Sequence, residues 1–247
     1  MTDLKDNARI ALACLDLTSL NDGDTAADIE RLCERAQGSS GHAAAVCVWP
    51  RFAALARSRL PTAIRVAAVA NFPDGSSDIE RAVADTQAIV DAGAQEVDVV
   101  LPYRHLAAAP ALLAAVRRAC DGLTLKVIIE TGELDDDTIR RACAIALEAG
   151  ADFLKTSTGK TKVSATPAAA RLLLQAIGAS PAARGHVGFK AAGGVRSVAD
   201  AAIYIALTAE VLGPVTPQRF RIGASGLLND IDAVLGGGGP PAAASSY

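Results

Sequence analysis

One lysine ends a short apolar run, and hydroxyl side chains and a glycine follow it directly. In the segment 152–160, DFLKTSTGK, the residue Lys155 ends the run and a second lysine, Lys160, follows after the glycine. Burial disfavours the charged form of a lysine, so an amine at the end of a buried strand can be neutral enough to attack a carbonyl. Lys155 is therefore our candidate Schiff-base nucleophile; the ordinary alternative is a strand-end lysine with its ammonium in water.

A second segment, 188–196, has the same layout of apolar run, lysine and glycines, and its lysine is Lys190. Further charged residues end apolar runs or interrupt them. If these runs are strands of one barrel, the side chains share a common volume: Asp16, Asp98, Lys126, Lys155 and Lys190. Repulsion between ammonium groups, added to burial, lowers lysine pKa values, and a carboxylate can move protons through water. Glu96 has the same strand parity as Asp98 and needs an inward partner that the sequence does not identify.

Glycine-rich turns follow the last three apolar runs. The residues that we expect to bind a phosphate are Gly159, Lys160, Gly193, Gly194, Gly223, Ser225 and Gly226. Backbone amides in such loops, with a helix N-terminus that begins near Ser225, form the phosphate site common at the carboxyl end of α/β barrels.

Apolar runs alternate with segments of helical periodicity along the whole chain. The expected strands lie near 10–16, 44–49, 65–71, 95–101, 124–130, 151–156, 186–190 and 219–223, and helices include 78–92, 106–121, 136–149 and 197–212. Such alternation predicts parallel βαβ units and an α/β protein that forms a single (β/α)8 TIM barrel. An open doubly wound sheet would need a glycine-rich turn after the first strand, and the sequence 15–19, LDLTS, has no glycine.

The bulk composition fits one barrel. The chain has 247 residues, of which 51% are hydrophobic and 4% aromatic, and a formal charge of −3 that argues against a nucleic-acid partner. We expect one domain over 1–235 and a flexible tail over 236–247. Scattered, unpaired cysteines and the absence of a signal or spanning segment suggest a reduced cytoplasmic protein without membrane contact. We expect Cys47 to be a buried small side chain and no histidine to bind a metal.

The motifs resemble those of the 2-deoxyribose-5-phosphate aldolase family, whose members are class I aldolases on a (β/α)8 barrel. The matching stretches lie between residues 15 and 225: LDLT at 15–18, VANFP at 69–73, EVDVV at 96–100, KVIIET at 126–131, LKTSTG at 154–159, GFK at 188–190, GGVR at 193–196 and RIGAS at 221–225. The resemblance implies reversible cleavage of a deoxyribose phosphate without a cofactor or metal. Two departures are Gly226, where the family commonly has a hydroxyl, and Ala191, where it often has proline.

The resemblance also implies residue roles. Lys155 would form the imine, Asp98 would move protons through water, and Lys190 would lower the pKa of Lys155. Asp16 and Lys126 would complete the polar interior, and the terminal Tyr247 would help to move a proton at the enamine carbon. The family suggests a homodimer. Two alternatives stay open: a related class I aldolase or transaldolase that uses a ketose phosphate, and a catalytically silent barrel that binds a sugar phosphate.

Overall fold

Parallel strands close into a barrel in the computed structural model, which describes residues 3–236. The strands are β1 (Leu15–Thr18), β2 (Ala45–Val48), β3 (Arg65–Ala70), β4 (Glu96–Val100), β5 (Thr124–Ile128), β6 (Phe153–Lys155), β7 (Gly188–Ala192) and β8 (Phe220–Ala224). Each strand pairs in parallel with the next, and β8 pairs with β1. The predicted barrel is confirmed. Of the expected tail, residues 237–247, which include Tyr247, lie outside the described residues.

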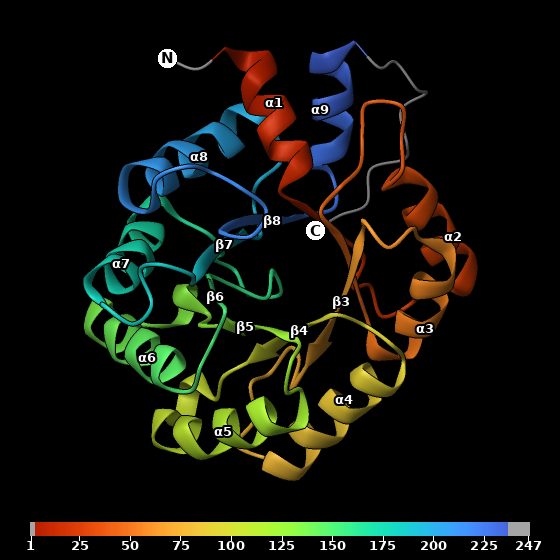
Figure 1. Ribbon diagram of the computed structural model, residues 1–247. Helices are drawn as coiled ribbons and strands as arrows, with labels where there is room; N and C mark the ends of the chain where they lie inside the picture. Colours follow the sequence, from red (N-terminus) through yellow and green to blue (C-terminus); the bar gives the residue numbers. More distant parts are fainter. Residues whose placement is uncertain (1–2, 237–247) are drawn as a thin grey trace.

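Helices surround the barrel, as Figure 1 shows in a view along its axis. They are α1 (Leu4–Ala13), α2 (Ala26–Arg35), α3 (Pro50–Arg59), α4 (Ile79–Asp91), α5 (Ala109–Ala119), α6 (Asp136–Glu148), α7 (Pro167–Ala179), α8 (Val198–Leu212) and α9 (Leu227–Leu235), with short 3₁₀ turns at Tyr103–Ala108 and Thr131–Glu133. The first and last helices, α1 and α9, pack side by side. No helix in residues 3–236 is long and apolar enough to cross a membrane.

Local sequence signals explain where several helices begin and end. The side chain of Asp78 accepts a hydrogen bond from the backbone of Arg81 and caps α4. Thr166 caps α7 in the same way, with a proline in the first turn. Gly93 and Gly150 follow α4 and α6 with φ values of 74° and 78°, a conformation that glycine adopts without steric cost. The caps fix where these helices begin, and the glycines end them shortly before the next strand.

The predicted first strand exists, but its predicted bounds of 10–16 were wrong. Residues 4–13 form α1, and β1 begins only at Leu15. Small apolar residues at helical spacing, Ala8, Ala11 and Leu12, are buried where α1 packs against α8 and α9. An apolar run that faces neighbouring helices has the same composition as a buried strand, so composition alone did not separate the two. The predicted helix over 106–121 likewise begins as the 3₁₀ turn, and α5 starts at Ala109.

Strand register places the inward side chains level with one another. Asp98 pairs with Lys126 across β4 and β5, and Lys155 pairs with Lys190 across β6 and β7. Below this level, the ring of Phe153 lies over Gly188 so closely that a Cβ at that glycine would be 2.3 Å from the ring. The glycine therefore makes room for an aromatic floor beneath the charged residues.

Candidate active site

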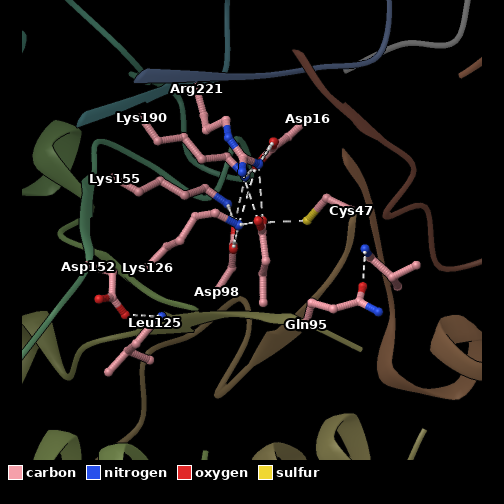
Figure 2. Close-up of polar contacts among 12 residues, drawn as sticks. Asp16, Cys47, Gln95, Asp98, Leu125, Lys126, Asp152, Lys155, Lys190 and Arg221 are labelled. Carbon is pink, nitrogen blue, oxygen red and sulfur yellow. Dashed lines mark hydrogen bonds and ion pairs between the residues drawn. The ribbon is translucent and has the colours of Figure 1, made fainter. Parts of the chain in front are cut away.

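Charged side chains from six strands point toward one another inside the barrel (Figure 2). They are Asp16 from β1, Glu96 and Asp98 from β4, Lys126 from β5, Lys155 from β6, Lys190 from β7 and Arg221 from β8. All of them are buried, and only 3% of Lys155 is exposed. The structure thus brings together all five charged residues that the sequence placed in a common volume, and it adds two partners.

Asp98 is the centre of the cluster. Its Oδ2 accepts hydrogen bonds from Nζ of Lys155 and Nζ of Lys190, each at 2.8 Å, and its Oδ1 accepts one from Nζ of Lys126 at 2.8 Å. Burial alone would raise the pKa of Asp98, but the ammonium of Lys126 and the two other lysines outweigh it and hold that pKa well below its ordinary value. Asp98 is therefore an ionised carboxylate at the centre of the cluster.

The three lysines differ in how many carboxylates they contact. Burial lowers the pKa of Lys155, and the nearby charge of Lys190 lowers it further, against the opposing effect of Asp98. Burial acts on Lys190 in the same direction, yet Asp16 and Asp98 outweigh it and raise its pKa. The pKa of Lys126 is raised for the same reason, by Asp98, Glu96 and Asp16. The expectation that lysine pKa values fall is thus confirmed for Lys155 and wrong for the other two.

Glu96 and Arg221 form a second layer next to these lysines. Nζ of Lys126 lies 2.5 Å from Oε2 of Glu96. The guanidinium of Arg221 donates to both oxygens of Glu96, at 2.8 and 3.1 Å, and to Oδ1 of Asp16 at 2.6 Å. Glu96 therefore has the inward partner that the sequence did not identify. Arg221 was missed, although it interrupts the apolar run of β8 in the same way that Asp98 and Lys126 interrupt theirs.

Glu130 fixes the loop that follows Lys155. Its backbone is left-handed, with φ of 58°. Its buried carboxylate accepts hydrogen bonds from Thr158, at 3.3 Å from the backbone amide and at 2.5 Å from the side-chain hydroxyl. The hydroxyl of Thr161 donates to it at 3.3 Å. Burial raises the pKa of Glu130 against the effect of these hydrogen bonds. Sequence reasoning missed this residue; a carboxylate that ends an apolar run was the available signal.

The expected phosphate loops lie after β6, β7 and β8. Gly159, Gly193 and Gly194 have φ values of 80°, 82° and 83°, and a Cβ on Gly193 would be 3.2 Å from Cα of Gly159. The loops after β6 and β7 are therefore in close contact, and side chains at these glycines would keep them apart. Nζ of Lys160 donates to the carbonyl of Leu20 at 2.7 Å, which ties the loop after β6 to the loop after β1.

The third loop differs from its prediction in one residue. Gly223 lies within β8 rather than after it, and a Cβ there would be 3.1 Å from Cε of Lys190. Its absent side chain makes room for that lysine. Ser225 and Gly226 do follow the strand, and Gly226 is the N-cap of α9, as expected for a helix that begins near Ser225.

Cys47 is fully buried, and its thiol donates weakly to Oδ2 of Asp98 at 3.9 Å. Burial, followed by the charge of Asp98, raises the pKa of this thiol, which matches the expected small buried side chain. Residues 3–236 contain no group of three or more histidine, cysteine, aspartate or glutamate residues able to hold a metal ion.

The chain is similar to known aldolases over nearly its whole length. The model of the DeoC/LacD family aldolases matches residues 10–231. A curated deoxyribose-phosphate aldolase from Agrobacterium fabrum is 47% identical over 254 aligned residues, which cover 98% of this chain and 97% of the relative.

Solved structures give the same answer for the fold. A candidate deoxyribose-phosphate aldolase from Toxoplasma gondii superposes with a TM-score of 0.86 and 25% identity over 94% of this chain and 95% of its own. A second candidate, from Coccidioides immitis, gives a TM-score of 0.80 and 27% identity over 92% of this chain and 86% of its own. With a family match that spans nearly the whole barrel, the chain belongs to the DeoC/LacD family of aldolases.

Proposed function

We propose that this aldolase reversibly cleaves 2-deoxy-D-ribose 5-phosphate to D-glyceraldehyde 3-phosphate and acetaldehyde, through an imine on Lys155. The observation that carries the proposal is the setting of this one amine: Lys155 is buried, has a lowered pKa, and contacts Asp98. The 47% identical relative named as a deoxyribose-phosphate aldolase supports the choice of substrate.

The first step is attack of the neutral Lys155 amine on C1 of the open-chain aldehyde. The carbinolamine loses water to give a protonated imine, whose positive nitrogen is the electron sink. Lys190 has a raised pKa and remains an ammonium, so it can donate the proton that the departing hydroxyl needs. Its fixed charge also disfavours a second charge on Lys155.

The second step is carbon–carbon cleavage. Asp98, acting through a water molecule, accepts the proton of the C3 hydroxyl. The electrons of the C2–C3 bond form the C1–C2 double bond of an enamine, the imine π electrons move to nitrogen, and glyceraldehyde 3-phosphate leaves. Protonation at C2 and hydrolysis then release acetaldehyde and regenerate Lys155. Tyr247 is our proposed proton donor at C2, and it lies outside the described residues.

The substrate phosphate is proposed to bind the glycine-rich loops. The loops after β6 and β7 lie in contact, and the N-terminus of α9 follows the loop after β8. Backbone amides and a helix N-terminus stabilise a bound phosphate. The proposed ligands are Gly159, Lys160, Gly193, Gly194, Gly223, Ser225 and Gly226, of which Gly223 would act through its backbone within β8.

Trapping with borohydride tests the proposal. In the presence of acetaldehyde, the protein should gain one ethyl group, and peptide mapping should place it on Lys155. Lys155→Arg should gain none, whereas Lys162→Arg, a change at an exposed lysine in the same loop region, should be labelled like the unmodified protein. A mark on another lysine would refute the assignment. Trapping with ketone donors instead of acetaldehyde would indicate a ketose-phosphate aldolase, and phosphate binding without trapping would indicate a silent barrel.

A further inference from the structure

The ionisable groups around Lys155, which lies on β6, come from every other strand of the barrel except β3, whose residues after its exposed first position are apolar. The groups are Asp16 on β1, Cys47 on β2, Glu96 and Asp98 on β4, Lys126 on β5 with Glu130 just after it, Lys190 on β7 and Arg221 on β8. Cys47 stays neutral because burial raises its pKa. Glu130 accepts hydrogen bonds from hydroxyl and amide donors and forms no ion pair within residues 3–236; burial raises its pKa and outweighs the charge of Lys155, which lowers it.

The connected ion pairs balance only when Lys155 is neutral. The carboxylates are Asp16, Glu96 and Asp98, and the cations other than Lys155 are Lys126, Lys190 and Arg221. Each carboxylate is thus matched by one cation. A proton on Lys155 would leave one uncompensated positive charge among side chains that are all buried, and such a charge is strongly disfavoured.

Arg221 keeps its positive charge at all pH values of interest, because a guanidinium does not lose its proton in a protein. Any excess positive charge must therefore be relieved at a lysine. Lys190 contacts two carboxylates, and Lys126 contacts three, whereas Lys155 contacts Asp98 alone within the described residues. The amine that gives up its proton most readily is then Lys155.

We propose that the buried guanidinium of Arg221, offset by the carboxylate of Glu96, supplies the third fixed cation of this network and so leaves Lys155 as a neutral amine. Arg221 is a positioning residue: it contacts Asp16 and Glu96 and acts on Lys155 through the network, without touching the reacting carbon. The inference rests on the proposed function, because it explains how the amine that forms the imine becomes available.

The charge count predicts opposite effects for two single changes and cancellation in the double change. In Arg221→Met, the network is neutral only when Lys155 is protonated, so the pKa of Lys155 should rise by about one unit or more. In Glu96→Gln, one positive charge is already in excess, so the same pKa should fall. In the double variant Arg221→Met, Glu96→Gln, one cation and one carboxylate are lost together, and the pKa should return close to its starting value.

Two pH profiles measure this pKa independently of each other. The first is the rate at which acetic anhydride acylates Lys155, followed by mass spectrometry with the exposed Lys162 as internal reference. The second is kcat/KM for cleavage of deoxyribose 5-phosphate. In both profiles, the rate falls on the acidic side as Lys155 becomes protonated, and we call this part the acid limb. It should move to higher pH in Arg221→Met and to lower pH in Glu96→Gln. In the double variant it should lie close to its position in the unmodified protein. Circular dichroism spectra confirm that each variant is folded.

The proposal is overturned if the limb of Arg221→Met coincides with that of the unmodified protein, or if the double variant is shifted as far as Arg221→Met. A purely structural role predicts this second result, because removing another buried partner would add damage. Where Arg221→Met fails to fold, Glu96→Gln decides alone, and a limb that stays or rises contradicts the proposal. If borohydride trapping fails in the unmodified protein, the proposed function fails instead, while the acylation profile still tests the charge balance.

Discussion

Lys155 and Lys190 donate to the same oxygen atom, Oδ2 of Asp98, each at 2.8 Å, and yet their pKa values move in opposite directions. The difference comes from Asp16, which contacts Lys190 and does not pair with Lys155. One carboxylate thus separates a lysine that can be a nucleophile from a lysine that stays a cation. Pairs of titratable groups with diverging pKa values are typical of acid–base catalysis.

Replacement of Asp98 by asparagine should separate imine formation from cleavage. Asparagine has nearly the same shape but cannot take the proton of the C3 hydroxyl, so kcat for cleavage should fall by about 10²- to 10⁴-fold. The amine of Lys155 loses its carboxylate partner and becomes easier to deprotonate, so trapping with acetaldehyde and borohydride should persist. Asp137→Asn, at an exposed position of α6, is the matched control and should leave both unchanged. Full cleavage activity in Asp98→Asn would contradict the proposed role.

Replacement of Glu130 by glutamine should weaken substrate binding more than chemistry. A glutamine has a single acceptor oxygen, so one of the hydrogen bonds from Thr158 or Thr161 is lost and the loop with Gly159 and Lys160 is held less firmly. The loss of one such bond costs about 1 kcal/mol, or roughly a fivefold rise in KM for the phosphate substrate. Trapping by acetaldehyde, which has no phosphate, should be unaffected. The exposed Glu133→Gln is the control, and an unchanged KM in Glu130→Gln would show that the loop is held without this carboxylate.

The sequence predicted the barrel and most of the charged interior, because alternating apolar runs fix the strands and a charged residue inside such a run must face a polar partner. It did not predict which residues partner each other. Asp16 and Arg221 are 205 positions apart in sequence, and only closure of β8 against β1 brings them together. The sequence therefore identified Glu96 as a residue in need of a partner but not the partner itself.

Two other errors have local causes. The segment 10–16 was assigned to a strand because it is an apolar run, whereas its residues Ala11 and Leu12 lie with Ala8 on the buried face of α1, against α8 and α9. The position of Glu130 at the end of an apolar run was visible in the sequence, but its left-handed backbone and its contact with Thr158 were not.

A side chain at Gly188 should destabilise the barrel. A Cβ there would lie 2.3 Å from the ring of Phe153, which is itself buried. Gly188→Ala should therefore lower the free energy of unfolding by about 1–3 kcal/mol, the usual cost of overpacking. Urea unfolding measures the change. Gly185→Ala, where a Cβ meets nothing within 4 Å, is the control. Phe153→Leu in the Gly188→Ala background should recover part of the lost stability. Equal stability of Gly188→Ala and Gly185→Ala would contradict the close packing of Phe153 against Gly188.

Stability should decrease in acid because of the buried carboxylates. The pKa values of Asp98 and Glu96 are lowered in the folded protein, from ordinary values of 3.8 and 4.5, since lysine and arginine charges outweigh burial. A group with a depressed folded pKa stabilises the fold above its unfolded pKa, and this stabilisation is lost as the pH falls toward the folded value. The free energy of unfolding should therefore be level above about pH 5 and fall below it, by about 1.4 kcal/mol per pH unit for each proton taken up.

Urea titrations at a series of pH values measure this slope. The double variant Arg221→Met, Glu96→Gln is the informative comparison, because it removes one carboxylate with a depressed pKa together with its cationic partner. Its slope below pH 4.5, the ordinary value of glutamate, should be smaller by up to one proton. A slope identical to that of the unmodified protein would mean that Glu96 is not ionised in the folded protein. The count of three carboxylates against three cations, which leaves Lys155 neutral, would then be wrong.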